Sequence, residues 1–162
     1  MLPKTLKNFT VFVDGVGYAG RIEEGAPPKT TLDTQEFAGG GMAGTVDIPM
    51  GTVAKMEFEF TLAEMNPDVI GKLGQADVPI TFRGAQGTEN EAVIIETRSL
   101  IREPDLGTWK RGDKNTLKIA ATASYYKLSI AGSDVIEVDV EAMKFVVRGV
   151  DQLAAVRTAL GL

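Results

Sequence analysis

Residues 56–62 carry the pattern that most limits what this chain can fold into. Large apolar side chains stand at positions 56, 58, 60 and 62, and Glu57, Glu59 and Thr61 stand between them. A repeat of two residues is typical of a β-strand, in which successive side chains point to opposite faces. The segment therefore predicts a strand with one apolar face, directed to a core, and one acidic face.

Similar patterns recur along the chain. Bulky and β-branched residues favour further strands, with Gly, Pro, Asn and Asp at the breaks, over residues 8–13, 16–22, 30–37, 45–48, 78–83, 92–102, 116–130 and 135–147. Residues 66–74 begin with Asn-Pro-Asp and end with Gly, which predicts a helix of roughly two turns. Residues 151–160, opened by Asp151 as a cap, repeat apolar side chains at helical spacing.

These elements predict a mainly β chain with one or two short helices and no alternation of strands and helices. The chain has 162 residues, of which 44% are apolar, so a single core can be buried. No domain boundary, internal repeat or low-complexity tail interrupts it. We therefore expect one domain over residues 1–162.

The residue types that are absent restrict the chemistry. The chain has no Cys and no His, which removes disulfides, thiol nucleophiles, imidazole metal sites and His-dependent catalytic triads. The formal net charge of −5 argues against a nucleic-acid clamp, which needs a basic face. No signal peptide or membrane span is expected. We expect a protein made in the cytosol that is not an enzyme and uses no cofactor or metal.

Two motifs allow a functional interpretation. Gly39, Gly41 and Gly44 have the spacing of a dinucleotide fingerprint, but residues 45–49 are β-branched and end in proline, so no helix can open at the third glycine. A flexible turn, or an arm lying against a neighbouring chain, remains. Glu57 and Glu59 could be catalytic carboxylates, although a solvated strand face is the stronger interpretation because no cleft is indicated.

Trp109 is the only tryptophan and is followed by Lys110 and Arg111 in a polar loop. It could stack on a base or a sugar, but packing onto a sheet edge or a partner subunit is favoured. Several long strands with a polar second face also indicate an open sheet, whose edges can pair with other chains. Specific pairing of that kind closes a ring.

Three stretches carry a resemblance to a known family: Leu2-Pro3-Lys4 through Asn8-Phe9 to Asp14-Gly15; Gly39-Gly40-Gly41-Met42 with Gly44, Ile48 and Gly51; and Gly149-Val150-Asp151 with Leu153, Arg157 and Leu160. In these stretches the chain resembles the major tail tube proteins of contractile-tailed phages and of R-type bacteriocins. The resemblance implies a β-sandwich-like or barrel-like tail tube fold. It also implies hexameric rings to which each subunit lends two hairpins for an inner barrel.

In this family the rings stack into a hollow tube around a tape-measure protein and inside a sheath, between baseplate and tail terminator proteins. The resemblance thus implies a virion component, assembled in the host bacterial cytoplasm, that has no membrane contact. DNA would pass through the channel at ejection without specific binding.

The resemblance also assigns roles to residues. Residues 33–51 would be a long, Gly-rich hairpin arm that reaches the adjacent ring, and Glu57, Glu59 and Thr61 would line the channel. Repeated carboxylates there would repel phosphate, so that DNA slides. The arm residues expected to contact another subunit are Phe37, Gly39, Gly40, Gly41, Met42, Gly44, Ile48 and Met50.

Alternatives remain open. The chain could be the tube subunit of an R-type bacteriocin or of a related contractile injection system, which carries no DNA. It could also be an ordinary β-sandwich binding module. A glycosidase without His would require a pocket with two unlike carboxylates.

Overall fold

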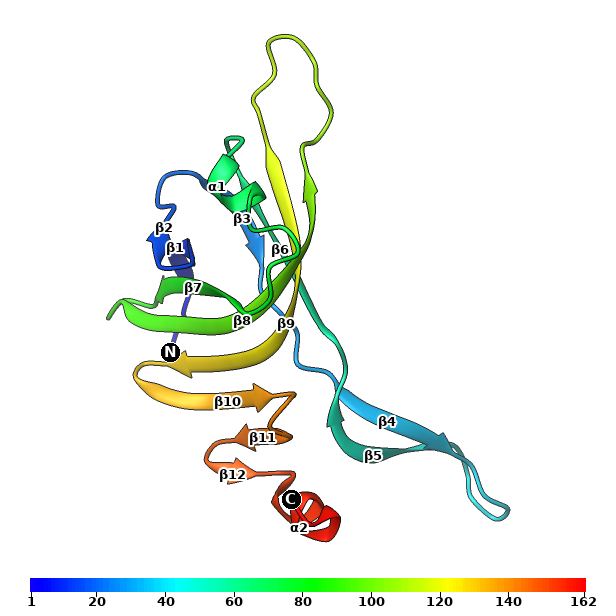
Figure 1. Ribbon diagram of the computed structural model, residues 1–162. Coiled ribbons are helices and arrows are strands. Elements are labelled where there is room, and N and C mark those ends of the chain that lie inside the picture. Colours follow the sequence, from blue (N-terminus) through cyan, green and yellow to red (C-terminus); the bar gives the residue numbers. More distant parts are fainter.

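The computed structural model describes residues 1–162, which form a mainly β subunit with two short helices (Figure 1). The strands are β1 (Leu6–Val13), β2 (Val16–Gly17), β3 (Ile22–Ala26), β4 (Leu32–Phe37), β5 (Val46–Val53), β6 (Met56–Leu62), β7 (Val78–Gln86), β8 (Glu91–Asp105), β9 (Leu117–Ile130), β10 (Ser133–Asp139), β11 (Lys144–Val147) and β12 (Val150–Asp151). The helices are α1 (Pro67–Ile70) and α2 (Ala154–Leu160). Ten strands form one antiparallel sheet, whereas β4 and β5 pair only with each other.

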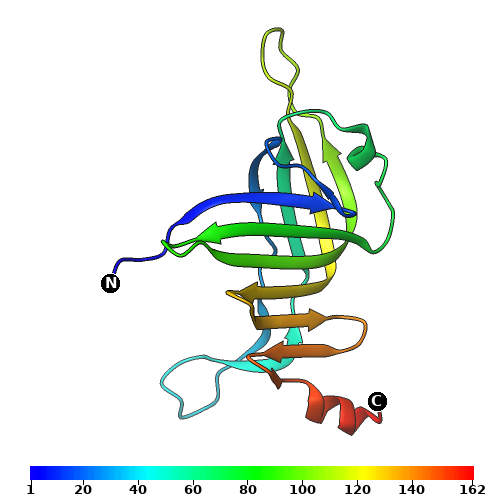
Figure 2. The same cartoon turned by 90° about the vertical axis from the view of Figure 1, so that its left-hand side faces the viewer.

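Strands β8 and β9 are long enough to belong to two layers. Residues 125–130 of β9 pair with β10, whereas residues 117–123 pair with β6. Between these halves the register of β8 against β9 shifts next to Ser99, and Ser124 is the extra residue. Such a bulge bends a strand and increases its twist. Strands β3 and β6 and the far halves of β8 and β9 therefore cross the remaining strands (Figures 1 and 2).

The core lies between these two layers. Phe58 and Phe60 of β6 meet Phe82 of β7 edge to face, with ring centroids 5.8 Å and 6.3 Å apart. All four apolar residues of β6 are buried, which confirms the alternation predicted for this segment. Aromatic contacts of this kind add to the burial of apolar area, and they fasten one layer to the other.

The predicted fold class is confirmed: a mainly β chain with short helices and a long hairpin. Several details differ. The strand predicted over residues 135–147 is split into β10 and β11 by a turn, in which Met143 has a φ of 52°. Helix α1 has only four residues, and the Asn66 side chain accepts hydrogen bonds from two of its amides. Strand β3 was not foreseen as a partner of β6, and β5 continues through Pro49.

Helix α2 begins slightly later than predicted. Asp151 does not occupy the N-cap position, which is Leu153, but its carboxylate accepts a hydrogen bond of 3.0 Å from the Leu153 amide and pairs with Arg157. The helix ends at Gly161, whose φ of 77° is left-handed and suits glycine. Neither helix is long and apolar enough to cross a membrane.

Candidate assembly surfaces

Strands β4 and β5 and the loop between them form a hairpin, called the arm below, which contains the predicted residues 33–51. The arm extends away from the layers in both views (Figures 1 and 2). At its base, Thr52 donates a hydrogen bond of 3.0 Å to Asp33. An isolated two-stranded hairpin is only marginally stable in water, so the arm has little support within the subunit.

The register of the arm gives it two different faces. Gln35 lies opposite Ile48 and Phe37 opposite Val46, which places Phe37, Val46 and Ile48 on one face. Glu36 lies opposite Asp47 on the other face. Val53, at the end of β5, is partly buried against the core. The other large apolar side chains of the arm are exposed, between 42% and 54%: Leu32, Phe37, Met42, Val46, Ile48 and Met50. The predicted contact residues are therefore uncovered in the subunit, and their contact with another subunit stays a prediction.

The glycine run forms the tip of the arm. Gly41 has a φ of 84°, which other residue types rarely adopt. A side chain on Gly39 would come within 3.3 Å of the Phe37 ring and 3.4 Å of the Met42 sulfur, whereas Gly40 and Gly44 face open space. Strand β5 follows the run, so no helix begins at the third glycine and a dinucleotide site is not formed.

The polar face of β6 is less acidic than the strand alone suggested. Glu57 lies 3.0 Å from the Lys55 ammonium and 3.7 Å from Arg102, and Glu59 lies 3.2 Å from Lys118. The hydrogen bond from Lys55, assisted by the charges of Lys55 and Arg102, lowers the pKa of the Glu57 carboxyl below its usual value. The expected acidic face is corrected to a face of mixed charge, because β8 and β9 supply cations.

Thr61 does not contribute to this face as expected. It is only 8% exposed, so it cannot offer its side chain to a channel in the subunit as it stands. A shallow depression of about 390 Å³ lies beside the carboxylates and is also lined by Lys29, Lys55 and Arg102. Each carboxylate is paired with a cation, which is unlike the unequal pair that glycoside hydrolysis needs. No group of three or more potential metal ligands is found.

The layer behind this face has two edges without a strand partner, called its free edges below. Strands β3, β6, β9 and β8 lie in that order, each antiparallel to the next. Strand β3 pairs only with β6. Strand β8 pairs with β7 up to Ser99, and its residues 100–105 have β9 on one side and no strand on the other. One backbone group of this segment is already satisfied from a loop, because the Ile101 carbonyl accepts a hydrogen bond of 3.2 Å from the Gly74 amide.

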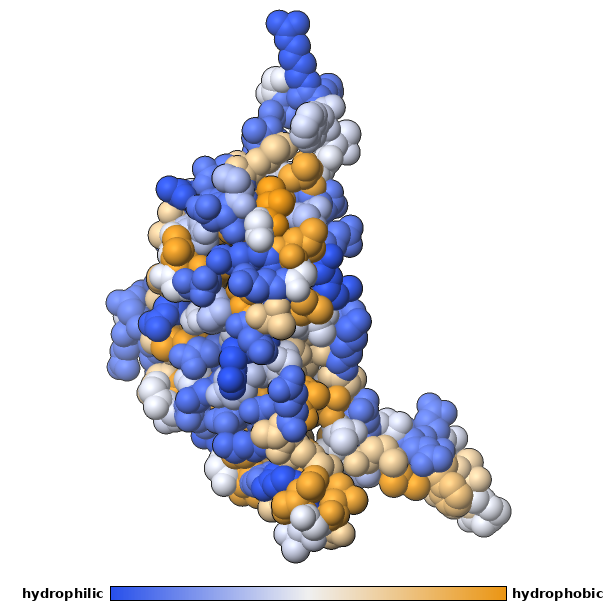
Figure 3. Space-filling view, in the orientation of Figure 1, coloured by the Kyte–Doolittle hydropathy of each residue, from blue (hydrophilic) through white to orange (hydrophobic).

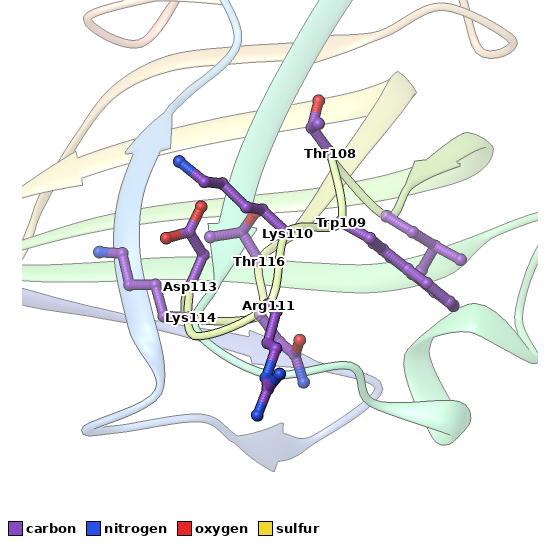
Figure 4. A pocket seen from close by; sticks show the side chains of 9 residues that line it. Thr108, Trp109, Lys110, Arg111, Asp113, Lys114 and Thr116 are labelled. Atoms are coloured by element: carbon purple, nitrogen blue, oxygen red, sulfur yellow. The ribbon is translucent and has the colours of Figure 1, made fainter.

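A loop over residues 106–116, called the Trp109 loop below, joins β8 to β9 and encloses a hollow of about 300 Å³ (Figure 4). Trp109 is 74% exposed and points away from Lys110. It therefore does not pack onto a sheet edge, which the sequence had left open. No ion pair reaches Lys110 or Arg111, whereas Lys114 pairs with Glu23.

Helix α2 presents an apolar surface that the sequence did not reveal. Its predicted apolar repeat suggested a buried face, but only Leu153 is buried. Val156 is 39% and Leu160 is 61% exposed. Apolar side chains gather over α2 and along the arm (Figure 3). A helix face stays exposed when no other element of the subunit packs against it. The sequence does not show which elements pack together, so it could not reveal this exposed face.

Comparison with known proteins resolves the family. The profile described as phage tail tube protein FII matches residues 3–161. The chain belongs to this family. The tail tube protein of Escherichia phage P2 is 31% identical over 170 residues, and the match covers 99% of both chains. The major tail tube protein of Serratia phage KSP20 is 31% identical over 143 residues, and the match covers 85% of this chain and 84% of that protein.

Solved structures with a similar fold come from contractile injection systems. A chain of the extended sheath–tube complex of the extracellular system PVC has a TM-score of 0.59 at 14% identity, covering 78% of this chain and 91% of its own. The tube-terminating cap of the anti-feeding prophage has a TM-score of 0.62 at 11% identity, covering 80% and 92%. These likenesses show the fold, and the resemblance to major tail tube proteins of contractile-tailed phages is confirmed.

Proposed function

We propose that this tail tube subunit forms hexameric rings, which stack into the tube of a contractile phage tail around a channel for DNA. The observation that carries the proposal is the four-stranded layer of β3, β6, β9 and β8, which ends in two free edges. The layer consists of two hairpin-like pairs: β8 with β9, and β3 with β6, which the arm connects. Two pairs from each subunit are what the family resemblance leads us to expect of an inner barrel.

The directions of the edges suit a ring. Three antiparallel steps separate β3 from β8, so the two edge strands run in opposite directions. Rotation about a ring axis places β3 of one subunit beside β8 of the next, and their pairing is then antiparallel as well. Such a head-to-tail contact closes when the rotation closes, and it leaves no unpaired edge for aggregation.

In this arrangement the face with Glu57 and Glu59 lines the channel. The carboxylates are paired with Lys55, Arg102 and Lys118. The phosphates of DNA in the channel would therefore be neither strongly repelled by free carboxylates nor strongly bound by unpaired cations of this face. DNA would therefore slide with weak interactions of either sign. Thr61 becomes a channel residue only if neighbouring subunits change its surroundings.

The proposal extends to partners and location. The family places the subunit in the virion, within a tube that a sheath surrounds, and the solved sheath–tube complex with a similar fold supports a sheath partner. A tape-measure protein inside the tube, baseplate and tail terminator proteins at its ends, and assembly in the host bacterial cytoplasm follow from the same family resemblance.

A second candidate is a tube that carries no DNA, as in an R-type bacteriocin or another contractile injection system. The similar folds in two such systems favour it, and a channel of mixed charge does not require DNA as cargo. Particles that contain this subunit can be purified and tested for DNA. Packaged DNA would support the phage tail, and particles without DNA would support the alternative.

Disulfide trapping tests the ring. The chain has no Cys, so a pair introduced at Ala26→Cys on β3 and Leu100→Cys on β8 is unique, and both positions are exposed on the proposed channel face. Oxidation should give a ladder of linked species that ends at six subunits. The matched pair Ala26→Cys with Glu89→Cys, at the far end of β7 and β8, should stay unlinked.

Electron microscopy of the concentrated protein gives the independent readout, namely rings or tubes with a central channel. A strictly monomeric protein at every concentration and salt condition, which no partner can polymerise, would contradict the proposal.

A further inference from the structure

Two segments of the subunit carry unpaired charge of opposite sign. The charged residues of the arm over residues 32–53 are Asp33, Glu36 and Asp47, all acidic. The Trp109 loop carries Lys110, Arg111 and Lys114 against one acid, Asp113. No ion pair of the subunit reaches Glu36, Asp47, Lys110 or Arg111.

The acids of the arm lie in an unfavourable arrangement. Glu36 and Asp47 are directly opposite each other across the hairpin, where like charges destabilise a strand pair. Both side chains are exposed and have no cation within the subunit. A cation supplied from outside would relieve the repulsion, so this face of the arm is suited to a basic partner.

The Trp109 loop has the matching chemistry. Its cations are exposed, and Trp109 offers a large apolar surface beside them. Tryptophan and arginine are the residues that most often dominate protein–protein contacts. At the tip of the arm, Phe37 and Met42 form an exposed apolar pair around Gly39, and aromatic rings pack favourably against methionine sulfur.

The two segments lie at opposite ends of the subunit. The Trp109 loop is at the top of both views and the arm at the bottom (Figures 1 and 2). They cannot meet within one chain, but they can meet between two chains displaced along the vertical direction of the views. When the loop of one subunit contacts the arm of another, the first subunit keeps a free arm and the second keeps a free loop. The contact can therefore repeat without limit along a stack.

We propose that the Trp109 loop of one copy of this chain receives the arm of a second copy in the next ring. Lys110 and Arg111 pair with Glu36 and Asp47 on one face of the arm. Trp109, which points away from Lys110, packs against Phe37 and Met42 on the other side of the tip, so the loop grips the arm from both faces. The inference rests on the proposed function, since it requires rings that stack. It adds the identity of the surface that holds the arm and the chemistry of that contact.

Charge reversal tests the pairing. Lys110→Glu with Arg111→Glu, or Glu36→Lys with Asp47→Lys, should each raise the protein concentration needed for tubes by about tenfold or more. All four changes in one chain restore opposite signs and should restore assembly. Lys7→Glu with Arg148→Glu, two exposed cations outside both segments, is the control and should assemble normally. Failure of the four-fold swap to recover any assembly, while each reversal blocks it, would overturn the pairing.

The fluorescence of Trp109 tests the apolar contact, because it is the only tryptophan. The emission should shift to shorter wavelength when tubes form, and acrylamide should quench it less than in the subunit. Phe37→Ser should reduce both changes in whatever tubes remain. Raised salt should weaken assembly and return the emission towards that of the subunit, because exposed ion pairs are screened.

The outcomes separate the two proposals. No ring or tube from the unchanged chain, with or without phage partners, would remove both. Normal tubes with unaltered Trp109 emission and tolerated charge reversals would overturn only this inference and leave the tube. A change of Trp109 emission on adding DNA, with none on assembly, would assign the loop to nucleic acid and overturn the inference as well.

Discussion

Strand β6 and the arm both alternate apolar and polar side chains, yet the subunit treats the two patterns differently. The apolar residues of β6 are at most 4% exposed, because β7 faces them across the core. Apart from Val53 at its base, those of the arm are at least 42% exposed, because no second layer covers them. The same local pattern therefore leads to a core in one place and to an exposed apolar surface in the other. Whether a second layer of the subunit faces the strand decides if its apolar side chains become buried.

The first prediction places one truncation in each region. Phe60→Ala should destabilise the subunit by about 3–5 kcal/mol, since it removes a fully buried ring and leaves a cavity between the layers. Phe37→Ala, exposed in the arm, should change the free energy of unfolding by less than about 0.5 kcal/mol. Chemical denaturation of the two variants measures the difference.

For tube formation, we expect Phe37→Ala to have a larger effect than Phe60→Ala, the reverse of their effects on subunit stability. Phe37→Ala should be folded but poor at forming tubes, whereas any Phe60→Ala protein that remains folded should form them. A loss of subunit stability from Phe37→Ala as large as that from Phe60→Ala would show that the arm belongs to the subunit's core. The inter-subunit role would then be wrong.

The second prediction concerns the glycines at the arm tip. Changing Gly39, Gly40 and Gly41 to alanine should harm stacking more than folding. Gly41 alone, with its φ of 84°, should cost about 1–2 kcal/mol in the tip conformation. The Gly39 side chain would also press on Phe37 and Met42. Because little else packs on the tip, the unfolding midpoint of the subunit should move only slightly.

Limited proteolysis provides the measurement. Cleavage between Phe37 and Met50 should be rapid in the isolated subunit and slow in the assembled tube. The alanine variant should stay sensitive under assembly conditions. Gly15→Ala, in the β1–β2 turn with a φ of 79°, is a matched glycine outside the arm and should leave stacking intact. Equal protection of the arm in subunit and tube would contradict its role.

Local sequence patterns predicted some elements of the fold correctly and could not predict others. The bounds of β6 were predicted correctly, and those of β9 to within one residue, because alternation and β-branched residues are local signals. The glycine run alone left a flexible turn and an arm open, and only the family resemblance implied the hairpin arm over residues 33–51. The family resemblance implied a β-sandwich-like or barrel-like fold, but the residues alone did not show where the sheet bends into two layers, because the bulge at Ser124 depends on the register against a distant strand. Local patterns do not encode that register.

The candidate site follows the same rule. Glu57 and Glu59 were correctly placed on the polar face of β6, but the strand alone predicted a purely acidic surface. The cations that neutralise it include Lys118 and Arg102, which lie more than forty positions away in the sequence and come close only when β8 and β9 pair beside β6. The exposed Trp109 was singled out, but its surroundings could not be predicted.

The third prediction tests the face of mixed charge. Glu57→Lys with Glu59→Lys should lower the unfolding midpoint slightly, because Lys55, Arg102 and Lys118 lose their partners and face new positive charge. Repeated around a ring, the basic cluster should bind DNA through phosphate and slow its ejection, with relief at higher salt. The isosteric control, Glu57→Gln with Glu59→Gln, adds no positive side chain, so tubes of this variant should retain DNA less than tubes of the Lys variant. Ejection at the normal rate from Lys tubes would mean that this face does not line the channel.

The last and smallest effect concerns α2, a peripheral segment that, unlike the arm, is fastened by internal contacts. Arg157 pairs with Asp151 and donates a hydrogen bond of 2.8 Å to the Met143 carbonyl. The hydrogen bond from Arg157 and that from the Leu153 amide hold the pKa of the Asp151 carboxyl below its usual value. A carboxyl whose pKa is lowered by folding stabilises the folded state above its usual pKa, and that contribution is lost as pH falls through the lowered value.

We therefore expect amide hydrogen exchange in α2 to become faster as the pH drops below the usual range of an aspartate, after correction for the intrinsic rate, while the β6 amides keep their protection. Asp151→Asn should give the acid-like exchange of α2 at neutral pH and abolish its pH dependence. It keeps an acceptor for the Leu153 amide but loses the charge that Arg157 requires. If α2 in Asp151→Asn still loosened at the same acid pH, another group would have to fasten the helix, and its contrast with the arm would need a different physical cause.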